Sequence, residues 1–164
     1  MGNILYYKMV LRLKQANKED WNFILEIRNL DEVRQACHDT SIISNSQHYQ
    51  YMEKISNDPN CYHWIVLMDN TRIGHTKIIL NEAINGVHEF GYMLIRKFRG
   101  KGLAKQIYES VFTEAKKLGI KKLHDTIKIE QEIPRIVALN VGFKDIEIIK
   151  KDGKHYAYSM IKEL

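Results

Sequence analysis

The stretch that decides the fold of this chain is Ile95-Arg96-Lys97-Phe98-Arg99-Gly100-Lys101-Gly102-Leu103-Ala104. An apolar run from Phe90 to Ile95 precedes it, and an apolar stripe with helical spacing begins at Leu103. Two glycines one residue apart allow backbone N–H groups to curve around an anion, next to the positive end of a helix dipole. The sequence therefore predicts a strand, an anion-binding turn and a helix, in that order.

The composition is that of one ordinary globular domain, which we expect to span residues 1–164. The hydrophobic share of 45% and the charged share of 27% are typical of such domains, and the formal net charge of +5 suits an anionic ligand. Cys37 and Cys61 are the only cysteines and form no CxxC motif, which argues against a disulfide framework and indicates a cytoplasmic location. Because no apolar run approaches about 20 residues, we expect no membrane association.

Hydrophobic periodicity gives the expected elements. We expect strands at 9–13, 62–68, 72–80, 87–95, 122–129, 143–149 and 155–161, and helices at 17–29, 47–55, 103–118 and 134–141. We expect a tight turn at Asp69-Asn70, and Asn85-Gly86 and Asp152-Gly153 are typical of tight hairpins between antiparallel strands. The helical crossover at 103–118 instead makes its flanking strands parallel. The order β-α-α-β-β-β-α-β-α-β-β predicts an α/β (α+β) fold. Its mixed, mostly antiparallel twisted sheet has about seven strands, flanked by about four helices.

Two common nucleotide-binding loops do not fit the glycine turn. A Walker P-loop requires GxxxxGK followed by Ser or Thr, but here the glycines are one residue apart and Leu103 follows Gly102. A dinucleotide-binding fingerprint requires GxGxxG after a parallel strand, but Lys105 occupies the third glycine position and hairpin patterns precede the turn. The turn therefore requires a third interpretation.

Residues 99–104, which follow a strand ending at Ile95, resemble the acyl-CoA loop of the GNAT N-acetyltransferase superfamily. The order of elements and the spacing to Gly142-Phe143 extend this resemblance over nearly the whole chain. One branch of the superfamily acetylates ribosomal-protein N-termini and amino-sugar nucleotides, including enzymes of the pseudaminic-acid pathway. The segments similar to that branch are Ile27-Arg28-Asn29, Trp64-Ile65-Val66 and Glu89-Phe90-Gly91-Tyr92. The resemblance implies direct transfer of acetyl from acetyl-CoA to a primary amine.

The resemblance also implies which residues bind the cofactor. The pantetheine arm of acetyl-CoA would pair, in a gap between the fourth and fifth strands, with the backbone of Met93, Leu94 and Ile95. The pyrophosphate would bind the backbone amides of Arg99, Gly100, Lys101, Gly102, Leu103 and Ala104. Lys97 places a cation where relatives carry Gln or Arg, and Gln131 would hydrogen-bond the cofactor where relatives carry Asn.

One position departs from the family pattern. Relatives often carry a tyrosine four residues before the glycine of Gly142-Phe143, where it protonates the departing CoA thiolate, but here that residue is Ala138. Either another group supplies the proton or the thiolate leaves unassisted. The candidate donors are tyrosines for which core packing is the alternative explanation: Tyr92, Tyr108, Tyr156 and Tyr158.

Glu89 is the candidate catalytic base. Strand alternation places it on the face shared by Gly91 and Met93, and a carboxylate on an otherwise apolar face is costly unless it is solvated, paired or functional. A structural ion pair is the alternative explanation. His75 on the neighbouring strand is a second candidate for base or acceptor binding, although a single histidine on a strand is more often structural.

The acceptor pocket is expected from the weakly patterned stretch between Leu30 and Asp58. Cys37 and His38 would line it, with Arg28 and Arg34 available for an anionic acceptor, and a solvated surface loop is the alternative. Covalent catalysis by Cys37 is disfavoured because adjacent residues rarely point their side chains at each other. We expect an amino-sugar nucleotide as the acceptor, followed by a protein N-terminal amine or a polyamine.

Further expectations concern other partners. The histidines show no HxxxH pairing, so we expect no metal. The cations are spread along the chain and balanced by 20 acidic residues, which argues against nucleic-acid binding. We expect a monomer or a homodimer. The alanine at position 138 keeps one alternative function open, a non-catalytic acyl-CoA-binding or sensor module with the same fold.

Overall fold

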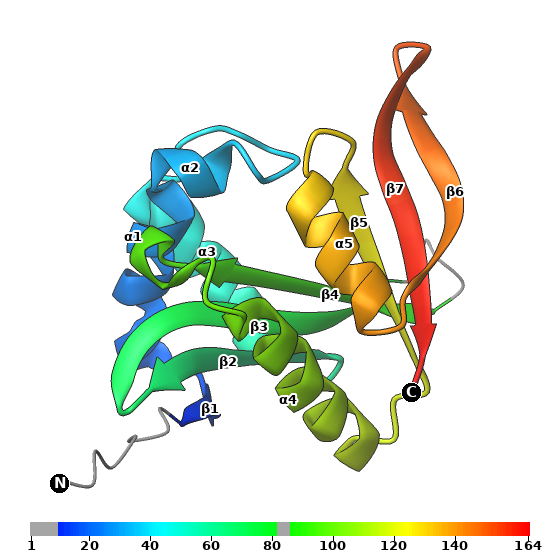
Figure 1. Cartoon of the computed structure of the whole chain (residues 1–164). Helices are drawn as coiled ribbons and strands as arrows, with labels where there is room; N and C mark the ends of the chain where they lie inside the picture. Colours follow the sequence, from blue (N-terminus) through cyan, green and yellow to red (C-terminus); the bar gives the residue numbers. More distant parts are fainter. Residues whose placement is uncertain (1–9, 82–85) are drawn as a thin grey trace, which may run out of the picture.

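A computed structural model describes residues 10–81 and 86–164 (Figure 1). Within these ranges, seven strands and five α-helices follow one another, with two short 3-10 helices labelled η1 and η3. In chain order the elements are β1 (Leu11–Gln15), η1 (Lys18–Asp20), α1 (Trp21–Asn29), α2 (Asp31–Arg34), α3 (Asn45–Ser56), β2 (Cys61–Met68), β3 (Thr71–Asn81), β4 (Val87–Leu94), η3 (Arg96–Phe98), α4 (Leu103–Lys117), β5 (Lys122–Lys128), α5 (Glu132–Asn140), β6 (Lys144–Lys151) and β7 (Lys154–Glu163).

One sheet contains all seven strands in the order β1-β2-β3-β4-β5-β7-β6. Neighbouring strands are antiparallel except for β4 and β5, which are parallel because a helical crossover joins them. The helices cover both faces (Figure 1): α1 and α3 pack on one face, and α4 and α5 pack on the other. The predicted fold class is confirmed, including its one parallel pair.

The turns that the sequence predicts have the required backbone geometry. Asp69 and Asn70, between β2 and β3, have φ of 45° and 68°, and Asp152 and Gly153, between β6 and β7, have φ of 51° and 75°. Two consecutive positive φ angles are typical of the tight hairpin turn whose twist matches that of its strands. Two residues of the predicted pattern lie outside the described residues: Met9 and Asn85.

The main differences from the sequence prediction lie between residues 30 and 46. A one-turn helix, α2, buries Val33 there, and α3 begins at Asn45 rather than at residue 47. Ser44 caps α3 through a reciprocal capping box, in which its side chain accepts from the Gln47 amide. A single turn contains too few residues to produce a helical hydrophobic pattern, so the sequence did not reveal α2.

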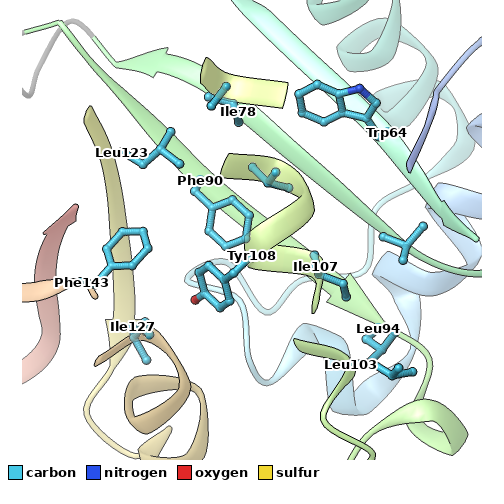
Figure 2. Packing of buried hydrophobic residues seen from close by; sticks show 14 of the residues in the cluster. Trp64, Ile78, Phe90, Leu94, Leu103, Ile107, Tyr108, Leu123, Ile127 and Phe143 are labelled. Carbon is cyan, nitrogen blue, oxygen red and sulfur yellow. The ribbon is translucent and has the colours of Figure 1, made fainter. Parts of the chain in front are cut away.

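Tyr108 is central to the packing of α4 against the sheet (Figure 2). Its ring is completely buried, and the ring centroid lies 4.6 Å from that of Phe90, 5.6 Å from that of Tyr92 and 5.7 Å from that of Phe143. Aromatic pairs at these distances contribute about 0.5–1.5 kcal/mol each beyond the area that they bury. Tyr108 therefore holds α4 against β4, and its hydroxyl contacts Asp125 of β5.

The strands β4 and β5 separate after only two paired positions. The parallel ladder joins His88 to Leu123 and Glu89 to His124, and beyond these pairs the two strands diverge (Figure 1). Along their whole lengths, β5 stays paired with β7 and β4 stays paired with β3. The sheet therefore contains a gap, which we call the β4–β5 opening, with Glu89 and His124 at its closed end.

Candidate active site

The glycine turn connects the end of β4, through η3, to α4. Gly100 and Gly102 have φ of 71° and 73°, in the left-handed region that favours glycine. Gly102 is the N-cap of α4, and no side chain caps this helix. A Cβ on either glycine would meet no atom within 4 Å. The glycines are therefore required by the direction of the backbone, and the space outside them is open.

Consecutive backbone amides of this turn are free to bind an anion. The Arg99 amide donates to the Arg96 carbonyl, but the described residues provide no acceptor for the amides of residues 100–102. The amides of Leu103 and Ala104 open α4, where the first N–H groups have no partner within the helix. These amides lie at the positive end of the helix dipole, an arrangement that can bind an anion.

Three cations of the turn have no acidic partner among the described residues. Lys97 and Lys101 place their Nζ atoms 5.1 Å and 5.7 Å from the centre of the Phe98 ring. In the part of the chain that the structure describes, no carboxylate lies within ion-pair distance of Lys97, Lys101 or Arg99. Their charge is therefore available to an anionic ligand.

The backbone of β4 shows which residues face the opening. Ile95 donates its amide to the Ile73 carbonyl at 2.9 Å, on the side of β3. Because the direction of the backbone polar groups alternates along a strand, Met93 also faces β3, whereas Tyr92 and Leu94 face the opening. Of the three residues assigned to the pantetheine arm from the sequence, only Leu94 thus directs its backbone groups toward the opening.

Tyr92 is the residue of this edge that the sequence assignment to the cofactor missed. Along a strand, only every second residue directs its backbone groups toward a given edge. Which residues of β4 face the opening depends on how β4 pairs with β3, and this non-local contact cannot be read from the sequence pattern. The Leu94 carbonyl accepts a hydrogen bond from Arg99 Nε at 2.9 Å, which holds the start of the glycine turn against the edge. An extended ligand that follows Tyr92 and Leu94 would therefore continue to the free amides of the turn.

Glu89 lies at the closed end of the opening. It pairs with His124 of β5, and Asn81 Nδ2 donates to its Oε2 at 3.1 Å. Its side chain lies on the face of Met93, which packs with α1 and α3. The described residues place no cationic side chain within ion-pair distance of Glu89. Glu89 is therefore a carboxylate with a polar neighbour at the point where the two strands separate.

Asp125, which the sequence reasoning did not single out, is a second carboxyl at the closed end. It follows His124 on β5, is 8% exposed, and accepts a hydrogen bond from the Tyr108 hydroxyl at 2.8 Å. Burial is the main cause that raises the pKa of Asp125 to about 7, and the charge of Glu89 adds to the rise, whereas the Tyr108 hydrogen bond opposes it. The available signal was an acidic residue in the middle of a strand, on the face that it shares with Leu123 and Ile127.

The loop between α2 and α3 reaches the ends of β5 and β7 (Figure 1). His38 Nδ1 lies 2.8 Å from the Tyr156 hydroxyl, and Lys128 Nζ donates to the Gln35 carbonyl at 2.9 Å. Cys37, beside His38, is a half-buried free thiol. The structure thus brings the predicted acceptor-binding residue His38 to β7, and the loop that carries it to the end of β5, which borders the opening.

Two arginines hold the backbone of this loop. Arg28 Nη2 donates to the Asp39 carbonyl at 2.7 Å, and Arg34 Nη1 donates to the Thr40 carbonyl at 2.9 Å. Arg28 Nη1 is buried and has no hydrogen-bond partner among the described residues. Arg28 therefore stabilises the loop and keeps a donor for a further group.

His75 lies in the interior of the protein. Its side chain is 4% exposed, and its ring centroid is 5.9 Å from that of His63 on β2. Burial is the main cause that holds the pKa of His75 well below 6.5, and nearby Lys77 adds to this effect. The structure therefore buries His75, which the sequence reasoning considered as a second candidate for base or acceptor binding.

Two residues that the sequence analysis discussed, Gln131 and Ala138, lie at the start of α5 and within it. Gln131 precedes the helix, its amide donates to the Lys128 carbonyl at 3.0 Å, and within the described chain its half-buried side chain forms no hydrogen bond. Ala138 is completely buried in the cluster that contains Tyr108. Its methyl group supplies no proton donor.

Within residues 10–81 and 86–164, no three His, Cys, Asp or Glu side chains are arranged so that they could hold a metal ion. In the same ranges, no helix has the length and apolar character needed to cross a membrane.

Known proteins share this architecture. A family model described as an acetyltransferase (GNAT) domain matches residues 10–144. The structure of spermidine N-acetyltransferase from Vibrio cholerae, in complex with CoA and spermine, is similar with a TM-score of 0.80 at 17% identity, over 93% of this chain and 95% of that chain. An aminoglycoside acetyltransferase in complex with coenzyme A gives a TM-score of 0.78 at 12% identity, over 94% and 95%.

A ribosomal-protein α-N-acetyltransferase in complex with coenzyme A gives a TM-score of 0.79 at 16% identity, over 94% of each chain. Among curated protein sequences, none is significantly similar to this chain. Because their sequence identities to this chain are low, the solved structures show only a common fold. The family model, by contrast, matches the sequence over most of the chain.

Proposed function

The chain belongs to the acetyltransferase (GNAT) domain family, and on this basis we propose that it transfers acetyl from acetyl-CoA directly to a primary amine. One observation carries the proposal: the open strand edge at Tyr92 and Leu94 leads to the free amides of residues 100–104. Strand edges pair with amide groups, and helix N-termini bind phosphates. Acetyl-CoA has both in this order, an amide-containing pantetheine arm followed by a pyrophosphate.

The residues of the turn and of β4 would bind and orient the donor. The amides of residues 100–104 hold the pyrophosphate, and Lys97 and Lys101 neutralise its charge. Backbone groups of Tyr92 and Leu94 hold the pantetheine arm and offer N–H donors near the thioester oxygen, where negative charge develops. When bound, acetyl-CoA supplies an activated acetyl group.

Glu89 prepares the acceptor for attack. An amine attacks only in its neutral form, so a carboxylate at the closed end of the opening accepts the proton that the ammonium group loses, directly or through a water molecule. The position of Glu89 beside the last paired residues supports this role. Proximity of the two bound reactants supplies much of the remaining rate.

For the acceptor we propose an amine that also carries an anionic group, such as an amino-sugar nucleotide. Donors and cations gather where the α2–α3 loop meets β5 and β7: Arg28, His38, Lys128 and Lys151, whose Nζ lies 5.4 Å from the centre of the Tyr156 ring. A protein N-terminal amine and a polyamine remain the alternatives, supported by the similarity to a ribosomal-protein acetyltransferase and to spermidine N-acetyltransferase.

Thermal unfolding with and without saturating acetyl-CoA tests the donor. We expect a higher unfolding temperature with acetyl-CoA, because a ligand that binds only the folded state stabilises it. Thiol release from acetyl-CoA is then measured with a panel of amino-sugar nucleotides, N-terminal peptides and polyamines. The absence of stabilisation by acetyl-CoA would refute the proposed donor.

A non-catalytic acyl-CoA-binding or sensor module is the competing function. Ala138 favours it, because this buried methyl group cannot protonate a leaving thiolate. The competing function predicts stabilisation by acetyl-CoA together with no thiol release for any amine of the panel.

A further inference from the structure

The Asp125 carboxyl is buried at the closed end of the β4–β5 opening. It is 8% exposed, and no cationic side chain of the described residues lies within ion-pair distance. The Tyr108 hydroxyl donates a hydrogen bond to it at 2.8 Å. A buried carboxyl is costly unless it is paired, neutral or functional, so this one calls for a chemical explanation.

The two carboxyls of the closed end lie on opposite faces of the sheet. Glu89 lies on the face of α1 and α3, from which the α2–α3 loop extends. Asp125 lies on the face of α4, whose Tyr108 contacts it and whose N-terminus holds the free amides. A pantetheine arm that enters from the glycine turn along Leu94 and Tyr92 would end between these two groups, with Asp125 on the donor side.

This inference rests on the proposed acetyl transfer: we propose that the protonated carboxyl of Asp125, held by Tyr108, protonates the sulfur of CoA as it leaves. After the amine nitrogen has bonded to the acetyl carbon, the carbon–sulfur bond breaks and its electron pair goes to sulfur. The Asp125 O–H proton goes to that sulfur, which gives the CoA thiol and the Asp125 carboxylate. The proton that the amine nitrogen loses, to Glu89 or water, restores the carboxyl.

The acidity of the available groups favours Asp125. Ala138, where relatives carry a tyrosine, has no proton to give. Burial raises the pKa of Tyr92 to about 12 and the pKa of Tyr108 well above 10, so both phenols hold their protons too tightly for efficient transfer to a thiolate. A carboxyl with a pKa of about 7 is partly protonated at neutral pH and is a stronger acid than a thiol.

The other two tyrosines, Tyr156 and Tyr158, lie on β7. The Tyr156 hydroxyl contacts His38 of the α2–α3 loop, and the Tyr158 ring lies 4.1 Å from the guanidinium carbon of Arg135. In the sheet order, β7 lies on the side of β5 away from β4, so neither tyrosine belongs to a strand that borders the opening.

The groups that contact Asp125 or influence its charge come from three elements. Tyr108 of α4 donates a hydrogen bond to it, Tyr92 and Glu89 of β4 are close enough to interact electrostatically, and Met160 is its partner on β7. The Tyr108 hydrogen bond stabilises the carboxylate, so its removal is expected to raise the pKa of Asp125 further. Because Tyr108→Phe is expected to raise the pKa of Asp125, this variant can test the role of Asp125 through the pH dependence of activity.

The test is a titration of the thiol of bound CoA, followed by the ultraviolet absorbance of the thiolate. The complex with CoA that lacks the sulfur serves as the blank. In the natural protein the Asp125 carboxylate opposes a second negative charge on the sulfur. We therefore expect the thiol pKa to fall by about 1 unit or more in Asp125→Asn. Asp152→Asn, in the exposed β6–β7 turn, is the matched control and should leave the thiol pKa unchanged.

Kinetics with the amine identified by the panel give a second measurement. We expect turnover to fall about 100-fold in Asp125→Asn, with the affinity for acetyl-CoA retained. The natural protein should lose activity above about pH 7 as Asp125 ionises. In Tyr108→Phe this loss should shift to higher pH, which a merely structural role of Tyr108 would not cause.

The outcomes separate this inference from the function on which it rests. Failure of the natural protein to bind CoA would overturn the proposed function and the role of Asp125 with it. CoA binding with equal thiol pKa in the natural protein and Asp125→Asn would overturn the role of Asp125 alone. If Asp125→Asn does not fold, an unshifted pH profile in Tyr108→Phe would overturn it.

Discussion

At the scale of single residues, Gly102 provides the sharpest test of the anion-binding turn. Alanine there would force a φ of 73° on a residue with a Cβ, at a cost of about 1 kcal/mol, and would place a methyl group in the open space beside the amides. Gly153 is a matched control because its φ is 75° and its surroundings are equally open, but it lies in the β6–β7 turn.

We expect Gly102→Ala and Gly153→Ala to lose similar stability in urea unfolding. Only Gly102→Ala should lose affinity for acetyl-CoA, by about 10-fold or more in calorimetric titration, because several charge-assisted contacts depend on the turn. Equal affinities in the two variants would contradict the assignment of the turn to the pyrophosphate.

Glu89 is the second residue-scale test. Glu89→Gln keeps the shape of the side chain but cannot accept a proton, so we expect kcat to fall about 100-fold with little change in the affinity for acetyl-CoA. The loss should shrink as the pH approaches the pKa of the free amine, because the amine is then already neutral. Glu53→Gln, on the exposed surface of α3, is the control. Turnover equal to that of the natural protein across the pH range would remove Glu89 as the base.

At the scale of elements, the contact between His38 and Tyr156 fastens the α2–α3 loop to β7. Tyr156→Phe removes this hydrogen bond, which typically contributes about 0.5–1.5 kcal/mol. We expect KM for the acceptor to rise about 2- to 10-fold while the affinity for acetyl-CoA is unchanged. Tyr49→Phe is the control, because it removes a similar surface hydrogen bond, to Asn22, between α3 and α1. An equal effect of both variants on KM would show that the loop contact does not shape the acceptor site.

The elements that the sequence predicted well are those with local signals. The turns at Asp69-Asn70 and Asp152-Gly153 and the helix after Gly102 depend on the backbone preferences of a few adjacent residues. Two other features depend instead on contacts between strands and helices that are distant in the sequence: the direction of the Tyr92 backbone groups, toward the opening, and the burial of Asp125 against Tyr108. Hydrophobic periodicity carries no information about such contacts, so the glycine turn and its helix were foreseen and the second carboxyl was not.

At the scale of the whole molecule, buried histidines link stability to pH. Burial lowers the pKa of four of them below 6.5 in the folded state: His48, His63, His75 and His124. Below pH 6.5 the unfolded chain therefore binds more protons than the folded one, and the free energy of unfolding falls as the pH drops toward the folded pKa values. Each histidine contributes up to about 1.4 kcal/mol per pH unit within its window.

Asp125 acts in the opposite direction. Its folded pKa of about 7 lies above the ordinary 3.8, so the folded state binds an extra proton between these values and gains stability as the pH falls. One such group is outweighed by four histidines, so we expect a net loss of stability from about pH 7 to pH 5.5, measured by urea unfolding. A free energy of unfolding that stays constant or rises over this range would contradict the buried, neutral state of the histidines.

The two-pair ladder between β4 and β5 has a consequence for the integrity of the sheet itself. Its backbone hydrogen bonds join the group β1–β4 to the group β5–β7 only over this short distance, so a bound pantetheine arm would act as a missing strand. Hydrogen exchange of the Tyr92 and Leu94 amides should slow when CoA binds, whereas exchange between β2 and β3 should not change. Unaltered exchange at both amides would place the arm elsewhere. Acetyl-CoA would then serve as a structural component as well as a reactant, since it completes the hydrogen bonding of the sheet in which it reacts.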